Sequence, residues 1–281
     1  MPSPTTPVSV IIPTHNRAGF LPQAIESVLS QSYANFELIV VDDGSTDDTP
    51  ALLSSYGTAF TSLRQENRGP AAARNAGISA ARHPLLAFLD SDDQFTKKKL
   101  ELQVSAMEAQ PELLISHTQE TWFRNGRHLN QKKRHAKEGG DIFARSLELC
   151  VVGMSTVMAR RELFDRVGLF DESFPCCEDY ELWLRASATH PFLLVDAPLT
   201  VKHGGREDQV SVRFKTGMDY FRIRAMEKLL VDIPLTSEQS RLAREELVRK
   251  ATLYGNGCLK HGRLEDGQRC LALAEHHASL A

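Results

Sequence analysis

The fold of this chain is decided by residues 8–48, which read VSVIIPTHNRAGFLPQAIESVLSQSYANFELIVVDDGSTDD. The stretch contains two short runs rich in β-branched residues, at 8–12 and 36–41, and each run stops at a polar loop. Between the runs, apolar residues recur at helical spacing from Leu21 to Leu29. A strand, a helix and a second strand in this order predict a βαβ unit with parallel strands.

The same alternation continues up to residue 93. We expect a weaker strand at 60–64, an alanine-rich helix at 70–81 and a fourth strand at 84–89. Pro70 suits the first turn of that helix, because no backbone N–H is needed there. Parallel strands joined through helices need helices on their faces, so these residues predict an open α/β sheet.

The remaining chain loses this regular alternation. Helices are expected at 97–109, 141–149 and 178–188, and extended segments at 113–123, 155–159, 192–195 and 199–203. From about Gly217 the pattern is helical, at 220–230, 237–254 and 263–278, with breaks at Pro234 and at glycines 255, 257 and 262. We therefore expect a helical C-terminal extension after the sheet.

The composition is that of a globular protein with a sizeable core. The 281 residues are 42% hydrophobic and 25% charged, and the net charge of −3 gives no general attraction to nucleic acid. No apolar run exceeds five residues, whereas a membrane span takes about 20. The start lacks the pattern of a secretory signal, and the five cysteines form no C-x-x-C pair, so neither a disulfide framework nor a zinc site is indicated. A cytoplasmic location is expected.

Polar clusters follow three predicted strands, at 13–17, 42–48 and 90–93. Ligands of open parallel sheets bind beyond the carboxyl ends of the strands, so these clusters should line one edge. Asp90 and Asp92, two residues apart, can share a divalent cation and a nucleotide ribose. A solvated loop or helix cap would use the same residues. The carboxylates would repel one another without a cation or a hydrogen-bonded base.

Four further side chains each have a structural and a functional interpretation. Arg74 is a helix-surface arginine or a contact for a base or pyrophosphate. Glu178 and Asp179 either compensate the dipole of the helix they begin or supply a carboxylate base. His203, at a strand end, is a surface histidine or a Mn²⁺ ligand. Neither a G-x-G-x-x-G nor a P-loop motif is present, so side chains and a metal would hold any nucleotide.

Taken together, these motifs resemble the inverting glycosyltransferase family 2 with the GT-A fold. The resemblance spans roughly residues 8–211 and rests on six segments in order: 8–17, 27–32, 36–47, 67–77, 89–93 and 178–183. It implies an α/β fold of the GT-A type, a Rossmann-like open mixed sheet flanked by helices. We expect a catalytic domain at 1–215, with its nucleotide-sugar part at 1–95 and its acceptor part at 96–215, and a helical extension at 216–281.

The resemblance also implies an activity. This is metal-dependent inverting transfer of a sugar from a nucleotide sugar, usually UDP-linked, to a hydroxyl of a saccharide or lipid-linked acceptor in cell-surface polysaccharide or glycolipid synthesis. The implied nucleotide contacts are Pro13, Thr14, Arg17, Asp43, Arg74 and, at the ribose, Asp90. The implied metal ligand for Mn²⁺ or Mg²⁺ is Asp92, with His203 or Asp93 as a further contact. Asp179 would be the general base, with Glu178 and Trp183 on the acceptor side.

Other interpretations stay open. A sugar-phosphate nucleotidyltransferase would want a glycine-rich basic loop, and residues 13–19 offer one glycine. A non-catalytic nucleotide-sugar-binding protein would share the fold. Residues 124–137 hold six Lys/Arg and no acid, which suits a solvated loop or contact with an anionic acceptor at the inner membrane face. The helical tail could pack on the catalytic domain, dimerise or contact lipid.

Overall fold

The computed structural model describes residues 4–206, 209–214 and 217–280. Within them, nine strands form one mixed sheet in the order β3-β2-β1-β4-β8-β6-β9-β5, with β7 paired to β6. The strands are β1 (Val8–Thr14), β2 (Phe36–Asp43), β3 (Thr61–Gln65), β4 (Leu85–Phe88), β5 (Gln94–Phe95), β6 (Ile115–Arg124), β7 (Arg127–Leu129), β8 (Met158–Arg160) and β9 (Leu193–Gly204). The α-helices are α1 (Leu21–Leu29), α2 (Thr49–Ser55), α3 (Pro70–Ala80), α4 (Lys99–Ala109), α5 (Phe143–Glu148), α6 (Arg161–Val167), α7 (Glu178–Thr189), α8 (Val210–Arg213), α9 (Met218–Asp232), α10 (Ser237–Lys260) and α11 (Leu264–Ala278).

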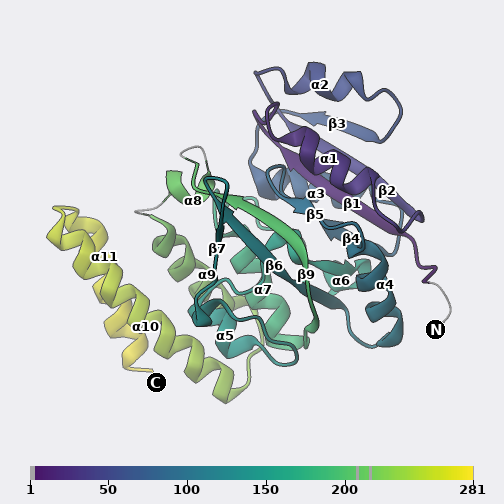
Figure 1. The fold of residues 1–281 in the computed structure, drawn as a ribbon. Helices are drawn as coiled ribbons and strands as arrows, with labels where there is room; N and C mark the ends of the chain where they lie inside the picture. Colours follow the sequence, from purple (N-terminus) through teal and green to yellow (C-terminus); the bar gives the residue numbers. More distant parts are fainter. Residues whose placement is uncertain (1–3, 207–208, 215–216, 281) are drawn as a thin grey trace.

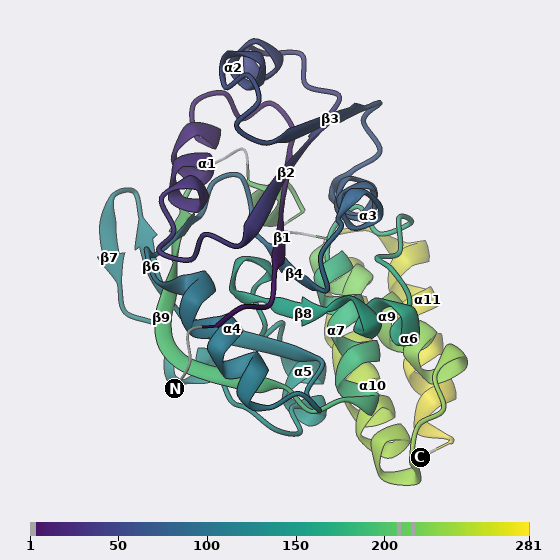
Figure 2. The same cartoon turned by 90° about the vertical axis from the view of Figure 1, so that its right-hand side faces the viewer.

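The first part of the sheet is parallel, as the sequence predicts. Strand β1 pairs in parallel with β2 and β4, and β2 pairs in parallel with β3. Alternate residues of β1 face opposite sides of the sheet: Val10 packs in the cluster that includes Ile25 of α1, whereas Ile11 packs with Ile78 of α3. Helices therefore cover both faces (Figures 1 and 2). The sequence missed helix α2, whose short apolar stripe consists of Leu52 and Leu53.

Beyond β4 the sheet becomes mixed. Strand β8 is antiparallel to both β4 and β6, and β9 is parallel to β6. The predicted strands at 192–195 and 199–203 are one strand, β9, because register shifts opposite Thr118–Glu120 absorb the residues between them. The segment predicted as a strand from 155 begins instead as a 3₁₀ turn at Met154–Thr156, and β8 follows it.

The C-terminal helices pack on the sheet domain. A shared cluster joins Leu147 of α5 and Leu184 of α7 to Met226 of α9 and Leu247 of α10, and α10 and α11 lie side by side at one end of the molecule (Figures 1 and 2). The helical tail therefore packs on the sheet domain, which is one of the three possibilities that the sequence leaves open.

The predicted end of the second tail helix at residue 254 was wrong, because α10 continues to Lys260. A Cβ at Gly255 would lie 3.0 Å from the Leu271 Cγ and 3.1 Å from the Gly267 carbonyl oxygen. The glycine therefore permits close approach of α10 and α11 rather than ending the helix. Gly262, with φ of +76°, follows the true end. No helix within the described residues has the length and apolar character needed to cross a membrane.

Candidate active site

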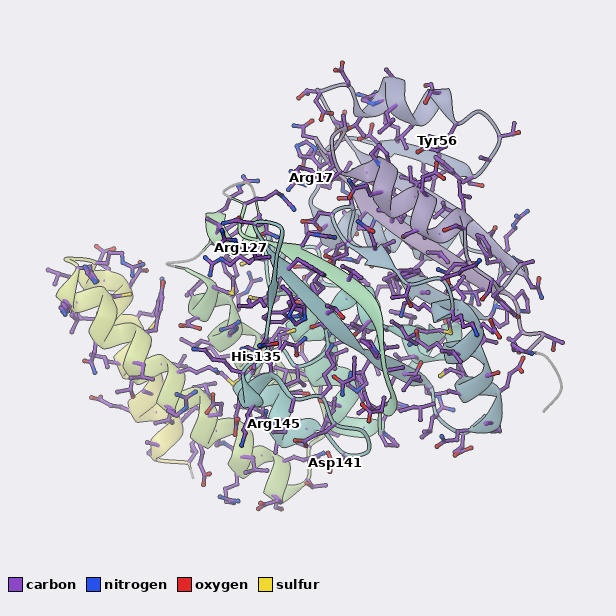
Figure 3. The ribbon with its side chains drawn as sticks, in the orientation of Figure 1. Arg17, Tyr56, Arg127, His135, Asp141 and Arg145 are labelled. Atoms are coloured by element: carbon purple, nitrogen blue, oxygen red, sulfur yellow. The ribbon has the colours of Figure 1, made fainter. Side chains whose placement is uncertain are left out.

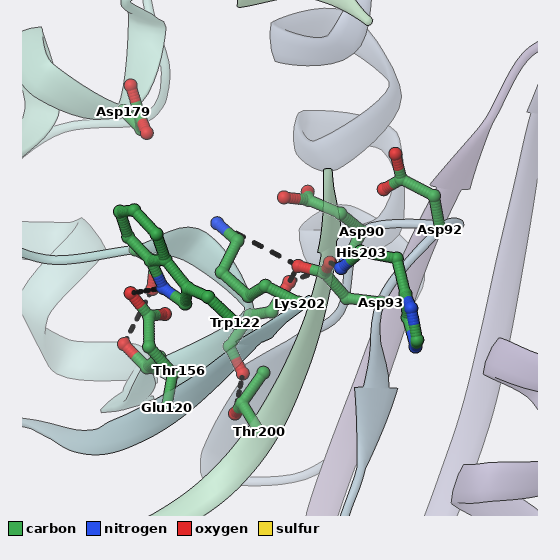
Figure 4. Close-up of polar contacts among 12 residues, drawn as sticks. Asp90, Asp92, Asp93, Glu120, Trp122, Thr156, Asp179, Thr200, Lys202 and His203 are labelled. Atoms are coloured by element: carbon green, nitrogen blue, oxygen red, sulfur yellow. Dashed lines mark hydrogen bonds and ion pairs between the residues drawn. The ribbon is translucent and has the colours of Figure 1, made fainter. Parts of the chain in front are cut away.

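The three polar clusters predicted from the sequence follow neighbouring strands. Strands β1, β2 and β4 are parallel, so Thr14, Asp43 and Asp90 come at or just after the same edge of the sheet. We call this edge the carboxylate rim. In Figure 4 Asp90 and Asp92 are drawn near one another, and Asp179 stands apart from both.

Asp43, a predicted nucleotide contact, shapes the loop before α3. One carboxylate oxygen accepts hydrogen bonds from the Gln65 side chain (2.7 Å) and the Arg68 backbone N–H (3.0 Å). The other accepts from the Gly69 backbone N–H at 2.8 Å. Asp43 is buried, and its observed role is to hold residues 65–69 against the end of β2.

The predicted contacts from the first loop lie at the end of β1. Pro13 and Thr14 are buried strand residues, and the Thr14 hydroxyl has no hydrogen-bond partner within the described residues. The Arg17 backbone N–H donates to the Thr49 hydroxyl at 3.0 Å, and its guanidinium donates to the Asn16 carbonyl at 3.2 Å. Figure 3 shows Arg17 beside the carboxyl ends of the first strands. The roles of Pro13, Thr14 and Arg17 as nucleotide contacts therefore stay predictions.

Arg74 is a buried residue, not the surface arginine that was one interpretation of the sequence. Its guanidinium donates to Asp90 at 2.8 Å and to Glu178 at 2.5 Å, and its cationic end lies over the Phe170 ring. Although burial opposes the shift, the charges of Glu178 and Asp90 hold the pKa of Arg74 above its usual value. Burial raises the pKa of Glu178, against the effect of Arg74. Arg74 thus links α3, the rim and the start of α7.

Asp92, the predicted metal ligand, forms an ion pair with Arg206. The Arg206 guanidinium also lies 4.2 Å from the centroid of the Phe20 ring. The Asp92 carboxylate offers the oxygen ligands that a divalent cation such as Mg²⁺ prefers. In this structure the Arg206 guanidinium supplies the positive charge beside it. No cluster of three or more His, Cys, Asp or Glu side chains that could hold a metal ion occurs in the part of the chain that the structure describes.

Asp93, the alternative metal contact, is buried in the protein. Its carboxylate accepts a hydrogen bond from the Ser155 hydroxyl at 2.7 Å and from the His203 backbone N–H at 3.3 Å, and the Lys202 ammonium lies 3.8 Å away. Burial raises the pKa of Asp93 to about 8. Its observed contacts tie the rim to β9, so it has little surface to offer a metal ion.

His203 is held beside the same rim by its backbone. Its ring is stacked on Phe123, with centroids 5.8 Å apart and planes at 24°, and its Nε2 lies 3.3 Å from the Gln94 side-chain nitrogen. In Figure 4 the imidazole points away from the Asp92 carboxylate. The role of His203 as a metal ligand stays a prediction that requires another side-chain orientation.

Asp179 lines a pocket of about 220 Å³, which we call the Asp179 pocket. The pocket is also lined by Glu120, Trp122, His135, Cys150, Lys202 and Arg222. The Cys150 thiol lies 3.5 Å from the Asp179 carboxylate. Burial and the charge of Asp179 hold the pKa of Cys150 well above its usual value, so the thiol stays protonated and donates to the carboxylate. Asp179 is thus oriented at the wall of a pocket.

Two predictions for the acceptor side need correction. Trp183 is 2% exposed and packs edge-to-face against Phe192 inside the core, so its indole cannot touch an acceptor in this structure. Lys137, the last of the six basic residues at 124–137, is also buried, and its ammonium lies 3.4 Å from the Glu120 carboxylate. That pairing neutralises Lys137, whereas Arg127 lies on the exposed hairpin (Figure 3).

The sequence did not single out Trp122, Lys202 or Arg222, which line the Asp179 pocket. Trp122 and Glu120 are two residues apart in a predicted extended segment, and strand periodicity would have placed both on one face. Lys202 directly precedes His203, the candidate metal ligand, but carries no motif of its own. Arg222 lies on α9, in the helical tail, where no local pattern marks it.

Comparison with solved structures defines the class of fold. The chain aligns with S. aureus TarS 1-349 in complex with UDP-GlcNAc at a TM-score of 0.64 and 18% identity, covering 97% of this chain and 92% of that one. It aligns with the mannosyltransferase PcManGT from Pyrobaculum calidifontis in complex with GDP-Man and Mn²⁺ at a TM-score of 0.65 and 16% identity, covering 100% and 77%. The fold is therefore of the GT-A type, as the sequence predicts.

Sequence comparison gives the family. Residues 9–168 match the model described as glycosyl transferase family 2. An uncharacterized glycosyltransferase of Rickettsia felis is 37% identical over 203 residues, which are 69% of this chain and 32% of that protein. The Escherichia coli UDP-Glc:alpha-D-GlcNAc-diphosphoundecaprenol beta-1,3-glucosyltransferase WfgD is 32% identical over 182 residues, 63% of this chain and 68% of that protein. The chain belongs to glycosyltransferase family 2, although it spans about a third of the Rickettsia felis relative.

Proposed function

We propose that this chain transfers a sugar, with inversion, from a nucleotide sugar to a hydroxyl of a saccharide or lipid-linked acceptor. Family membership supports transfer from an activated sugar. The Escherichia coli relative, a UDP-Glc transferase with a lipid-diphosphate acceptor, and the UDP-GlcNAc complex of TarS support UDP as the donor nucleotide and a lipid-linked acceptor. The observation that carries the proposal is the placement of Asp179 in a pocket apart from the Asp90 and Asp92 rim, with the Lys202 side chain directed between them (Figure 4).

On the donor side, we assign nucleotide binding to the carboxylate rim. Asp90 would accept hydrogen bonds from the ribose, and its ion pair with Arg74 fixes the direction of its carboxylate. The backbone at Pro13 and Thr14, together with Arg17 and Asp43, would meet the base. Both carboxylate oxygens of Asp43 already accept hydrogen bonds from residues 65–69. We therefore assign Asp43 an indirect role, in which it holds this loop in place beside the base.

Asp92 is the residue that we assign to a Mn²⁺ or Mg²⁺ ion, and Arg206 would leave it when the ion binds. These ions commonly use one or two protein carboxylates and complete their shell with substrate phosphates and water, so a single well-placed carboxylate fits that pattern. When bound, the metal would neutralise negative charge on the departing diphosphate. The PcManGT complex holds Mn²⁺ together with GDP-Man, which supports this choice of cofactor.

On the acceptor side, we assign proton removal to Asp179. An acceptor hydroxyl is a poor nucleophile until its proton is accepted during attack. Asp179 lines a pocket, receives a hydrogen bond from the Cys150 thiol and is bound at its other oxygen by the Tyr180 backbone N–H at 2.7 Å. Both contacts orient the carboxylate, so a proton taken from the acceptor reaches a positioned base. Attack from the face opposite the leaving group inverts the anomeric carbon.

We further propose the division of the chain expected from its sequence. Residues 1–95 would bind the donor, residues 96–215 the acceptor, and residues 216–281 would form an extension that supports α7. Contacts of α9 with α7, and of α10 with α5, favour this supporting role. Peripheral membrane contact through the exposed part of 124–137 belongs to the same proposal, since a lipid-linked acceptor would be met at the inner membrane face.

A thermal-shift screen of nucleotide sugars with Mn²⁺ tests the proposal. The preferred donor should stabilise the chain by about 2.7 kcal/mol at 100 times its dissociation constant. Asp92→Ala should lose the metal-dependent part of that stabilisation, and Asp196→Ala, which removes an exposed carboxylate of β9, should keep it. Full metal-dependent donor binding by Asp92→Ala would contradict the assignment. Release of pyrophosphate from a nucleoside triphosphate and a sugar phosphate would favour a nucleotidyltransferase instead.

A further inference from the structure

The walls of the Asp179 pocket come from segments far apart in the chain. Trp122 comes from β6, Cys150 from the turn after α5, Lys202 from β9 and Arg222 from α9. One wall is aromatic and another is cationic, and the candidate base Asp179 lies at the same pocket. A concave site with an aromatic surface and a few placed polar groups is the usual form of a small-molecule subsite.

The aromatic wall is fixed in place. The Trp122 indole N–H donates to the Glu120 carboxylate at 2.8 Å, and the Lys137 ammonium lies 3.4 Å from the other oxygen of that carboxylate. The rings of Trp122 and His135 are 5.3 Å apart at an angle of 54°. Because the polar edge of the indole is already satisfied, its faces offer apolar surface. The C–H face of a pyranose ring matches such a surface, while its hydroxyls project outward to polar groups.

The cationic wall carries donors that a saccharide ring alone would not need. The Lys202 ammonium lies 3.8 Å from the Asp93 carboxylate. Arg222 donates to Asp219 at 3.1 Å, and its Nε has no hydrogen-bond partner within the described residues. Both side chains are of basic residues, and guanidinium donors suit phosphate oxygens. They supply positive charge in a pocket where Asp179 must remain free to accept a proton.

We propose that the Asp179 pocket is the acceptor subsite and that it selects a saccharide bearing a phosphate or diphosphate group. The sugar ring lies against the Trp122 indole with a hydroxyl toward Asp179, and the phosphate oxygens meet Arg222 and Lys202. The inference rests on the proposed transferase function. It gives the helical tail a part in specificity, because Arg222 lies on α9, beyond the residues 9–168 that match the family model.

Tryptophan fluorescence and acceptor kinetics test this inference together. The chain has two tryptophans, and Trp183 is in the core. A ligand that binds against Trp122 should therefore change the tryptophan emission of the wild type, and Trp122→Phe should not show that change. The probes are a short-chain lipid diphosphate of N-acetylglucosamine, N-acetylglucosamine 1-phosphate and the uncharged methyl glycoside. We expect the two phosphorylated probes to change the emission of the wild type and the methyl glycoside to bind at least tenfold more weakly. Similar emission changes with the lipid diphosphate and with N-acetylglucosamine 1-phosphate would show that the sugar phosphate is recognised. An emission change with the lipid diphosphate alone would show that recognition needs the diphosphate.

The variants separate the ring contact from the charge contact. Trp122→Ala should raise the KM for every acceptor, and Trp122→Phe should bring the KM most of the way back to the wild-type value. Donor-induced thermal stabilisation should be unchanged in both variants. Arg222→Gln should raise the KM for phosphorylated acceptors by roughly tenfold, the value of one charged hydrogen bond, and leave the methyl glycoside unaffected. Arg224→Gln, on the same helix but bound to Ser173, is the matched control and should change neither.

The outcomes distinguish the two proposals. Transfer by the wild type that neither Trp122→Ala nor Arg222→Gln alters would overturn the acceptor subsite and leave the transferase proposal standing. Equal binding of the methyl glycoside and the phosphorylated probes would overturn selection of a phosphorylated acceptor. Phosphate-dependent binding at Trp122 without transfer from any nucleotide sugar would support the subsite and overturn the proposed catalysis.

Discussion

The first half of the sheet domain, residues 8–95, and the second half, residues 96–206, keep their polar side chains in different places. Strand β1 is buried throughout and almost wholly apolar, and the aspartates of the first half that the site uses gather at the carboxyl ends of β2 and β4. The second half buries polar groups between its helices and strands: the Lys99 side-chain nitrogen donates to Gln103 at 2.6 Å and to the Thr156 carbonyl at 3.1 Å. The rim is thus built by local motifs, whereas the Asp179 pocket rests on a polar layer that needs the whole fold.

This difference separates the two proposed tasks. Donor binding would depend mainly on residues at the carboxyl ends of adjacent strands within the first 95 positions. Proton removal would depend on Asp179 and on side chains brought together from β6, β9 and α9. Variants of each half should therefore fail in different ways.

The largest effect should come from Asp179→Asn, which keeps the size of the side chain and removes its basicity. We expect the transfer rate to fall by about 10²–10⁴-fold, the usual contribution of a general base, with the donor dissociation constant unchanged. Initial rates and calorimetric donor titration check both values. A rate within a few-fold of the wild type would remove Asp179 from the mechanism.

Arg74→Met should break the link between the two halves. The substitution leaves the buried carboxylate of Glu178 and the rim residue Asp90 without their shared cation, which costs about 3–5 kcal/mol for a buried pair. Urea unfolding measures the loss. Arg68→Met is the control, because the exposed pair of Arg68 with Glu172 contributes less than about 1 kcal/mol. Similar losses in both variants would show that the two halves are not joined through Arg74.

Replacing Lys132, Lys133 and Arg134 together by Gln should weaken membrane contact of the second half. Each basic residue near an anionic bilayer contributes about 1 kcal/mol of attraction. Sedimentation with vesicles of phosphatidylglycerol and phosphatidylcholine measures the change, and Lys137 is left in place because it is buried beside Glu120. Unchanged membrane association together with an unchanged KM for the acceptor would refute a role for the basic segment.

The buried polar layer of the second half should make stability depend on pH through His117. Burial lowers the pKa of His117 to about 3, from 6.5 for an exposed histidine. Between these values the unfolded chain binds the additional proton, so the stabilising contribution is complete above pH 6.5 and is lost as the pH falls toward 3. The slope from this group is at most about 1.4 kcal/mol per pH unit. Urea unfolding at about pH 6, 5 and 4, which lie inside that window, should show a smaller slope in His117→Gln than in the wild type. An identical slope would contradict the low pKa of the buried His117.

Much of the first half could be predicted from the sequence because its signals are local. The strands at 8–12 and 36–41 and the helix at 70–81 all appear close to their predicted places. The ion pair of Arg74 with Glu178 could not be predicted, because its partners are 104 residues apart. Burial of Arg74 could not be read from an alanine-rich helix whose packing faces were unknown.

Prediction was poorer in the second half for a related reason. Trp183 has the spacing of a helix face but no signal that distinguishes a core position from a ligand contact, and it lies in the core. Gly255 reads as a break, yet its role is to let α11 approach α10. Arg222 reaches the pocket only because α9 packs on α7, which is a tertiary fact.

The anomeric configuration of the product is the decisive measurement for the role of Asp179. If Asp179 activates an acceptor hydroxyl opposite a nucleotide held at the rim, an α-linked nucleotide sugar must give a β-linked product in a single displacement. Proton NMR of the first product formed from the donor selected in the thermal-shift screen reads the anomeric coupling. We predict the β anomer from the wild type and formation of the same product at least about 10²-fold more slowly from Asp179→Asn; an α-linked product, or the same product from Asp179→Asn at the wild-type rate, would refute the role of Asp179.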